Sequence, residues 1–387
     1  MENALNGCAP QLRVGVRGGV GVLLCYAVMA LADALGVLSA QAGLVGFSST
    51  LFFIWFAVAP LPVGALCCRV GTVPMLQAAL SVSVLACALL GVGMWSRWCS
   101  AVGFCLAGLS NVCLQVVVPV WAASRFSCSR LAGVVTGGLF MKTAVAVSFP
   151  FAVYALSGMG CWWLSLLPFA VVSAAACFVV KGATGGGDGR LAAQIPAFVG
   201  VRRVLKDPVV RCAVIAFAIA VVADVAFNLS VPGAVASRFG GDGASAGTVY
   251  AVWFGVKLPL MLVGSRLFQR HDARRFFGGA ALVSLAGAVV MLACGGWRMY
   301  LLGVGLFAAG FANVYGHVFG SAAPRHPDDA PAVSALVVMS ISSGALASPL
   351  LSSVGGLGLC APEWMVLALV AFLAPFAAFL SMSRGRP

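Results

Sequence analysis

Apolar residues fill long, uninterrupted stretches of this chain, and short segments between them carry most of the charges. A helix needs about 20 apolar residues to cross the hydrocarbon core of a membrane. The length of the stretches excludes a β-barrel, whose strands alternate in polarity. The pattern therefore predicts an all-α, polytopic membrane protein with twelve transmembrane helices in two six-helix bundles. The predicted spans are 16–38, 41–66, 73–94, 98–123, 131–156, 161–181, 209–237, 245–268, 274–296, 298–320, 331–352 and 362–382.

Composition and charge agree with this class. The chain is 62% hydrophobic and 9% charged, whereas a soluble domain has about 25% charged residues. The net charge of +13 would suit nucleic acid, but no exposed face interleaves basic and aromatic residues, so no nucleic-acid partner is expected. Most of the 23 Lys and Arg lie in segments on one side of the predicted membrane. This bias places both termini in the cytoplasm, and we expect a monomer in a bacterial cytoplasmic (inner) membrane.

The longest polar stretch, residues 181–211, separates six spans from six. It predicts an N-terminal six-helix bundle at 1–181, a cytoplasmic linker at 182–208 and a C-terminal six-helix bundle at 209–387. The linker begins with a flexible glycine-rich sequence. It ends in a basic segment that is suited to lying along the inner membrane surface.

The two halves share sequence, which indicates a duplication. The stretch AGLSNVCLQV (107–116) aligns with AGFANVYGHV (309–318), and LADALG (31–36) aligns with VADVAF (222–227). The matched polar residues are Asn111 with Asn313, Gln115 with His317, and Asp33 with Asp224. Two parallel repeats of six spans are the architecture of the major facilitator superfamily. In that fold the first, fourth, seventh and tenth helices, which carry these matches, line a central cavity.

Ionisable residues inside apolar spans are energetically unfavourable, so they are functional candidates. We expect Asp33 and Asp224 to bind a proton or the substrate, and Lys142 and Lys257 to tune the charge of these carboxylates. Side-chain amides offer donors and acceptors to a hydroxyl-rich solute. The candidate substrate-binding residues are Asn111, Gln115, Asn228, Asn313 and His317. Alternatively, Asp33–Lys142 and Asp224–Lys257 are structural ion pairs, and the amides hold helices together.

Several stretches resemble the fucose/galactose/glucose:proton symporter branch of the superfamily. They are ADALGVLSAQAGL from residue 32, GLSNVCLQVVVPVW from 108, GLFMKTAVAVS from 138 and VADVAFNLSVPG from 222. The resemblance implies that Asp33 is the proton or substrate carboxylate. Gln115 stands where fucose-type members carry a Glu, and Val118 replaces the Asn of their Asn-Pro pair. Since a glutamine does not titrate, the coupling residue and the sugar specificity stay open.

We therefore predict a secondary active transporter that moves a small hydrophilic solute, a sugar, by proton symport with alternating access. Its partners would be the solute and the lipid bilayer, with a proton as coupling ion and neither cofactor nor metal. The sequence has no G-x-x-x-x-G-K-[ST] motif for ATP and no H-E-x-x-H motif, so an enzyme is not expected. A multidrug or metabolite exporter of the same fold and a non-transporting membrane sensor or scaffold are the alternatives.

Overall fold

The computed structural model describes most of the first half of the chain and parts of the second half. The described residues are 2–35, 47–93, 96–126, 128–182, 197–208, 243–267, 273–293, 295–312, 325–326, 329 and 331–341, with scattered positions between 210 and 240. The chain divides into two compact units. One unit consists of Met1–Val201 and Pro327–Val338, and the other of Arg202–His326 and Met339–Pro387.

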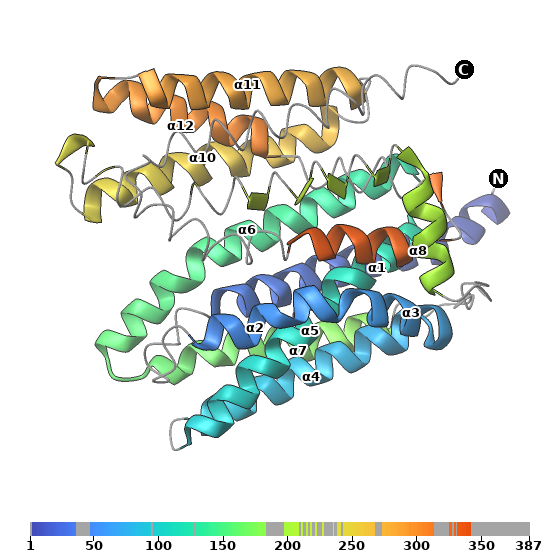
Figure 1. Cartoon of the computed structure of the whole chain (residues 1–387). Helices are drawn as coiled ribbons and strands as arrows, with labels where there is room; N and C mark the ends of the chain where they lie inside the picture. Colours follow the sequence, from blue (N-terminus) through green and yellow to red (C-terminus); the bar gives the residue numbers. More distant parts are fainter. Residues whose placement is uncertain are drawn as a thin grey trace. The chain divides into compact units, whose positions relative to one another are not determined.

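The first unit is built from helices that follow the predicted spans closely. They are α1 (Glu2–Ala34), α2 (Phe47–Val58), α3 (Pro60–Val70), α4 (Thr72–Val92), α5 (Arg97–Arg125), α6 (Cys128–Gly158), the 3₁₀ turn η2 (Trp162–Ser165) and α7 (Leu166–Gly182). Helix α8 (Ala197–Lys206) lies in the predicted linker, and the boundary between the two units falls within it, after Val201. Figure 1 shows α1, α4, α5 and α7 running lengthwise beside one another. The second predicted span is two helices, because Pro60 begins a new helix after Ala59. Proline 119, in contrast, lies inside a continuous α5.

Small residues let the helices of this unit approach closely. A Cβ atom at Gly108 of α5 would lie 2.5 Å from the carbonyl oxygen of Phe52 on α2. On another side of α5, the Ser110 hydroxyl donates to the carbonyl of Ala79 on α4 at 2.7 Å, and its oxygen lies 2.5 Å from Ser83 Oγ. Such contacts are typical of helices that associate within a membrane. They place α5 at the centre of the unit, in contact with α1, α2, α3, α4 and α6.

A segment from the second half of the sequence also belongs to the first unit. Pro331–Ile341 is helical, and Ser334 donates from its hydroxyl to the carbonyl of Val116 on α5 at 2.8 Å. The carbonyl oxygen of Pro331 lies 3.2 Å from the position of a Cβ on Gly64 of α3. These contacts explain why Pro327–Val338 groups with the first unit. The predicted bundle limits, 1–181 and 209–387, stay a prediction.

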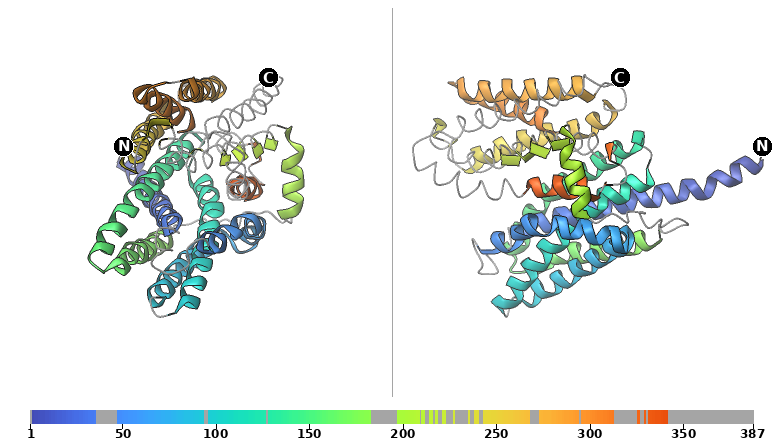
Figure 2. Two further views of the ribbon diagram at one scale, coloured as in Figure 1. Left: turned by 60° about the vertical axis from the view of Figure 1, so that its left-hand side comes forward. Right: turned by 45° about the vertical axis from the view of Figure 1, so that its right-hand side comes forward.

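The second unit repeats the packing pattern of the first. Its long described helices are α10 (Gly243–Leu267), α11 (Ala273–Ala293) and α12 (Trp297–Phe311). Helices α11 and α12, drawn in orange, lie side by side in both views of Figure 2. Gly287 of α11 and Gly303 of α12 lie at the contact between these two helices. Gly103 of α5 lies against Leu90 of α4 in the same way. The pairs α11–α12 and α10–α12 correspond to α4–α5 and α2–α5, which fits the duplication in the sequence.

Three described helices have the length and composition of a complete membrane span, namely Thr72–Val92, Arg97–Arg125 and Trp163–Gly182. Helices α4 and α7 expose large apolar side chains along their outer faces, and Phe178 of α7 is 77% exposed. Large exposed apolar surfaces of this kind mark contacts with a membrane or with protein, and the length of these helices fits a membrane span. The core of the central helix α5 is almost fully buried, so the polar residues it carries lie within the unit.

We predict that Gly108→Val destabilises the first unit by about 1–3 kcal/mol, the usual range for overpacking. The Cβ has no space because it would meet backbone atoms of Phe52, which cannot move aside as a side chain does. Thermal unfolding of the purified protein in detergent measures the effect. Gly91→Val in α4 is the control, since nothing lies within 4 Å of a Cβ there. Equal melting temperatures for the two variants would contradict the close α2–α5 crossing.

Candidate functional site

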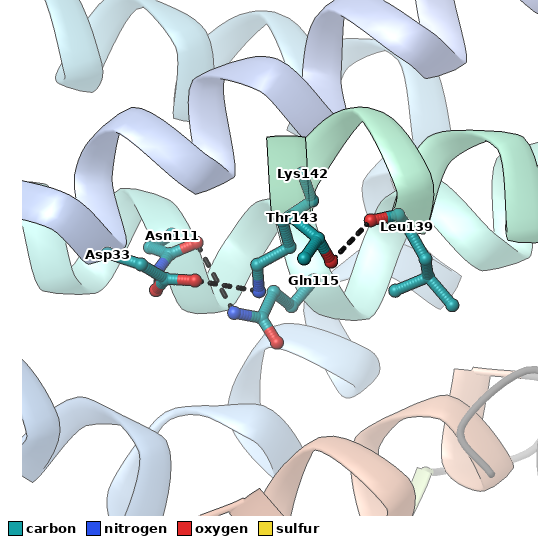
Figure 3. Close-up of polar contacts among 6 residues, drawn as sticks. All are labelled: Asp33, Asn111, Gln115, Leu139, Lys142 and Thr143. Carbon is teal, nitrogen blue, oxygen red and sulfur yellow. Dashed lines mark hydrogen bonds and ion pairs between the residues drawn. The ribbon is translucent and has the colours of Figure 1, made fainter. Parts of the chain in front are cut away.

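An ion pair lies at the end of α1. The carboxylate of Asp33 is one residue before the last residue of α1, and its Oδ2 lies 2.8 Å from Nζ of Lys142 on α6 (Figure 3). The other carboxylate oxygen, Oδ1, accepts a hydrogen bond from Nδ2 of Asn111 on α5 at 2.5 Å. Three helices that are distant in sequence therefore meet at one carboxylate.

Two amides extend this network along α5. Asn111 and Gln115 are four residues apart, so they lie on the same face of the helix. Gln115 donates from Nε2 to Oδ1 of Asn111 at 3.4 Å. Asn111 is fully buried and Gln115 is 6% exposed. Figure 3 shows the carboxamide oxygen of Gln115 pointing away from Asp33, which leaves an acceptor at the far end of the chain of hydrogen bonds.

A close helix contact holds Lys142 within reach of Asp33. The ring of Tyr26 on α1 lies against Gly138 of α6, where a Cβ would overlap it. Asp33 is two helical turns beyond Tyr26, and Lys142 is one turn beyond Gly138, so each charged residue shares a face with a contacting residue. The absence of a side chain at Gly138 therefore lets α1 and α6 approach, and the two charges meet above the contact.

The ion pair is not sealed from its surroundings. The side chains of Lys142 and Asp33 are 22% and 28% exposed, respectively. Asn111, by contrast, is completely enclosed. The network thus has a buried amide end that holds the carboxylate and a partly exposed charged end.

The structure brings together four of the predicted site residues: Asp33, Asn111, Gln115 and Lys142. The hydrogen bond from Asn111 directly to Asp33 was not foreseeable from spacing, because it depends on how α1 and α5 are rotated. The predicted site residues Asp224, Asn228, Asn313 and His317 lie outside the described residues. Whether they form the matching half of the site therefore stays a prediction.

Lys257, the remaining predicted site residue, lies on α10 in the second unit. Its Nζ is 5.0 Å from the ring centroid of Trp253, one turn earlier, a distance at which a cation is attracted to an aromatic face. The side chain of Lys257 therefore follows the helix surface over Trp253. This contact gives the cation a partner on its own helix.

An aromatic cluster surrounds Trp253 and was missed by the sequence reasoning. The Trp253 ring stacks on Phe227 at a centroid distance of 4.4 Å and is 5.5 Å from Phe307 of α12; Phe311 adds a fourth ring. Trp253 is 1% exposed, so it packs the unit and does not offer a stacking face to a sugar. Phe227, Trp253 and Phe307 come from separate segments of the chain, so no spacing in the sequence signals this cluster.

The chemistry of the site follows from its donors. Within the part of the chain that the structure describes, no group of three or more His, Cys, Asp or Glu side chains could hold a metal ion. The network instead offers one carboxylate, one ammonium and two amides. This set can exchange hydrogen bonds with a polar solute.

Comparison with known proteins places this site in a known fold. No family model matches the chain, and no curated protein matches it in sequence. Solved structures, however, superimpose over nearly the whole chain. The E. coli fucose:proton symporter is 18% identical, with a TM-score of 0.80 over 95% of this chain and 98% of that one. The chain has the major facilitator fold.

Other structures with this fold are similar to the same degree. A bacterial homologue of the iron transporter ferroportin, in an outward-facing state, is 14% identical with a TM-score of 0.80, covering 96% of this chain and 99% of its own. The human organic anion transporter MFSD10 is 15% identical with a TM-score of 0.73 and covers 96% and 99%. The twelve-helix architecture predicted from the sequence is thereby confirmed. In this fold, the Asp33 network lies on the first, fourth and fifth helices.

We predict that Asp33 and Lys142 stabilise the protein as a pair. Asp33→Asn or Lys142→Gln alone leaves one charge without its partner, and the double variant leaves none. The melting temperature of the double variant is expected to lie well above the value that the two single effects predict by addition. The coupling should be about 1–3 kcal/mol, because the pair is partly exposed.

The matched control combines Asp33→Asn with Lys206→Gln in α8, which does not share a partner with Asp33. These two effects are expected to add. Strict additivity in the Asp33–Lys142 cycle as well, measured by thermal unfolding in detergent, would contradict the ion pair.

Proposed function

We propose that this protein is a secondary active transporter that carries a small hydrophilic solute, a sugar, together with a proton by alternating access. The observation that carries the proposal is the network of Asp33, Lys142, Asn111 and Gln115. A charged pair inside membrane-spanning helices is energetically unfavourable and is retained where transport needs it. The fold is shared with transporters, and one of them is a fucose:proton symporter.

Proton coupling would rest on competition for Asp33. When the carboxylate is ionised, Lys142 at 2.8 Å neutralises it. When Asp33 takes up a proton, the ion pair is lost and the ammonium of Lys142 needs another acceptor. A hydroxyl or ring oxygen of the solute would satisfy it. Proton binding and solute binding would therefore favour each other, as symport requires.

The amides would select the solute. Each carboxamide offers donors and acceptors, and the oxygen of Gln115 points away from Asp33 (Figure 3). A sugar hydroxyl can donate to that oxygen, whereas an apolar compound would leave it unsatisfied at a free-energy cost. This preference favours a polyhydroxylated solute over the apolar substrates of a multidrug exporter.

The second half of the site remains part of the proposal. By the sequence repeat, Asp224, Asn313 and His317 would supply groups that match Asp33, Asn111 and Gln115. Asn228, one turn after Asp224, would add an amide, and Lys257 would tune the charge of Asp224. The proposed location is a bacterial cytoplasmic membrane, and the bias of basic residues supports cytoplasmic termini. The proton is the proposed coupling ion.

Uptake into proteoliposomes tests the proposal. Radiolabelled L-fucose, D-galactose and D-glucose are offered with and without an imposed pH gradient, acidic outside. We expect gradient-driven accumulation of at least one sugar. In Asp33→Asn the accumulation should fall to the level seen without a gradient, because the side chain no longer titrates. Asp188→Asn, in the glycine-rich linker, is the control and should transport normally.

Two outcomes would overturn the proposal. One is that the pH gradient drives the uptake of none of these sugars. The other is that Asp33→Asn accumulates sugar as the wild type does, since a group other than Asp33 would then carry the proton.

A further inference from the structure

An apolar groove lies between α4 and α7 of the first unit, which pack side by side (Figure 1). Its volume is about 590 Å³, within the usual range for sites that hold a small molecule. One wall consists of α4 residues between Val84 and Val92, and the other of residues of η2 and α7 between Trp163 and Ala170. The lining contains only Val, Leu, Ala, Gly, Cys and Trp, so it offers no charged group to a ligand.

The groove is open because the residues at its centre are small. Ala88 and Gly91 of α4 belong to the lining, and nothing lies within 4 Å of a Cβ on Gly91. Larger lining side chains stand exposed around them: Trp163 is 41% exposed, Val92 47% and Leu167 52%. The groove is therefore continuous with the exposed apolar surface of α4 and α7, the surface that faces lipid in a membrane-spanning chain.

The extent of the groove matches one leaflet of a bilayer. From Val84 to Val92 an α-helix rises about 12 Å, and half of the hydrocarbon core is about 15 Å thick. The groove lies where α4 ends and α7 begins, so it is at the end of the spans away from the linker. A single lipid tail of the leaflet on that side would run along it.

The same end of α4 carries groups that suit a lipid headgroup. The turn after α4 is tight, since the backbone N–H of Ser96 donates to the carbonyl of Gly93 at 3.3 Å, and α5 then begins with Arg97 and Trp98. Arg97 is exposed and Trp98 is 83% exposed. Tryptophan is enriched where a membrane meets water, and arginine forms charge-assisted hydrogen bonds with phosphate oxygens.

We propose that the groove between α4 and α7 binds one acyl chain of a phospholipid in the leaflet opposite the linker, with the phosphate of that lipid at Arg97. The apolar lining supplies packing contacts to methylene groups, and the cation beside the end of α4 complements the phosphate. The inference does not depend on the proposed solute, because no residue of the Asp33 network lines the groove.

Quenching of Trp163 fluorescence by a brominated lipid tests this site. Phosphatidylglycerol with dibrominated acyl chains is titrated into the full-length protein in dodecyl maltoside. We expect a saturable phase of quenching in the wild type that is missing in Trp163→Phe. Ala88→Phe fills the groove and should weaken the binding seen in this phase about tenfold, as expected when a chain loses roughly ten close contacts. Arg97→Gln should weaken it about fivefold, through the loss of one cation.

The matched control is Ala78→Phe, which makes the same change at an exposed position of α4 outside the groove. It should keep the saturable phase with the affinity of the wild type. If Ala88→Phe does not fold, Gly91→Leu takes its place, because a side chain at Gly91 enters open space.

Three results would overturn the inference. The first is quenching that rises in proportion to the brominated lipid without saturation, which would indicate general contact with lipid only. The second is an equal affinity in Ala88→Phe and Ala78→Phe. The third is an unchanged affinity in Arg97→Gln, which would contradict the placement of the phosphate.

Discussion

A charge inside a membrane protein must be paired, and this constraint organises the first unit. Asp33 is balanced by Lys142 at 2.8 Å and held by Asn111, so α1, α5 and α6 are joined at one carboxylate. An isolated ion there would be costly by several kcal/mol. In the proposed function, a proton bound by Asp33 would break this ion pair and free Lys142 to bind the solute. Stability and proposed function therefore depend on one interaction.

Glycine positions determine where that interaction can form. Gly138 admits the Tyr26 ring, which brings α6 onto α1, and Gly108 admits the α2 backbone against α5. Without these contacts the helices would stand farther apart, and the side chains of Asp33 and Lys142 would not meet. The close packing at glycines thus brings the helices near enough for the charged groups to pair.

The sequence predicted the helices and much of the site, but not how the helices are rotated. Bilayer thickness fixes the length of a span, so apolar stretches locate α4, α5 and α7 within a few residues. The helix α1 begins earlier than predicted, at Glu2, because hydropathy marks the span and not the polar turns that continue its helix. Three features depend on tertiary packing, which the spacing of residues along one helix does not specify. They are the hydrogen bond from Asn111 to Asp33, the aromatic rings around Trp253 and the hydrogen bond from Ser334 to α5.

Proton movement during sugar uptake is the most direct test of the account. Proteoliposomes containing an internal pH-sensitive dye receive a saturating pulse of a transported sugar without an imposed gradient. We predict internal acidification with the wild type and none with Asp33→Asn, while sugar exchange at equal pH persists in the variant. Sugar entry without acidification in the wild type, or unchanged acidification in Asp33→Asn, would contradict the central role of the Asp33–Lys142 pair.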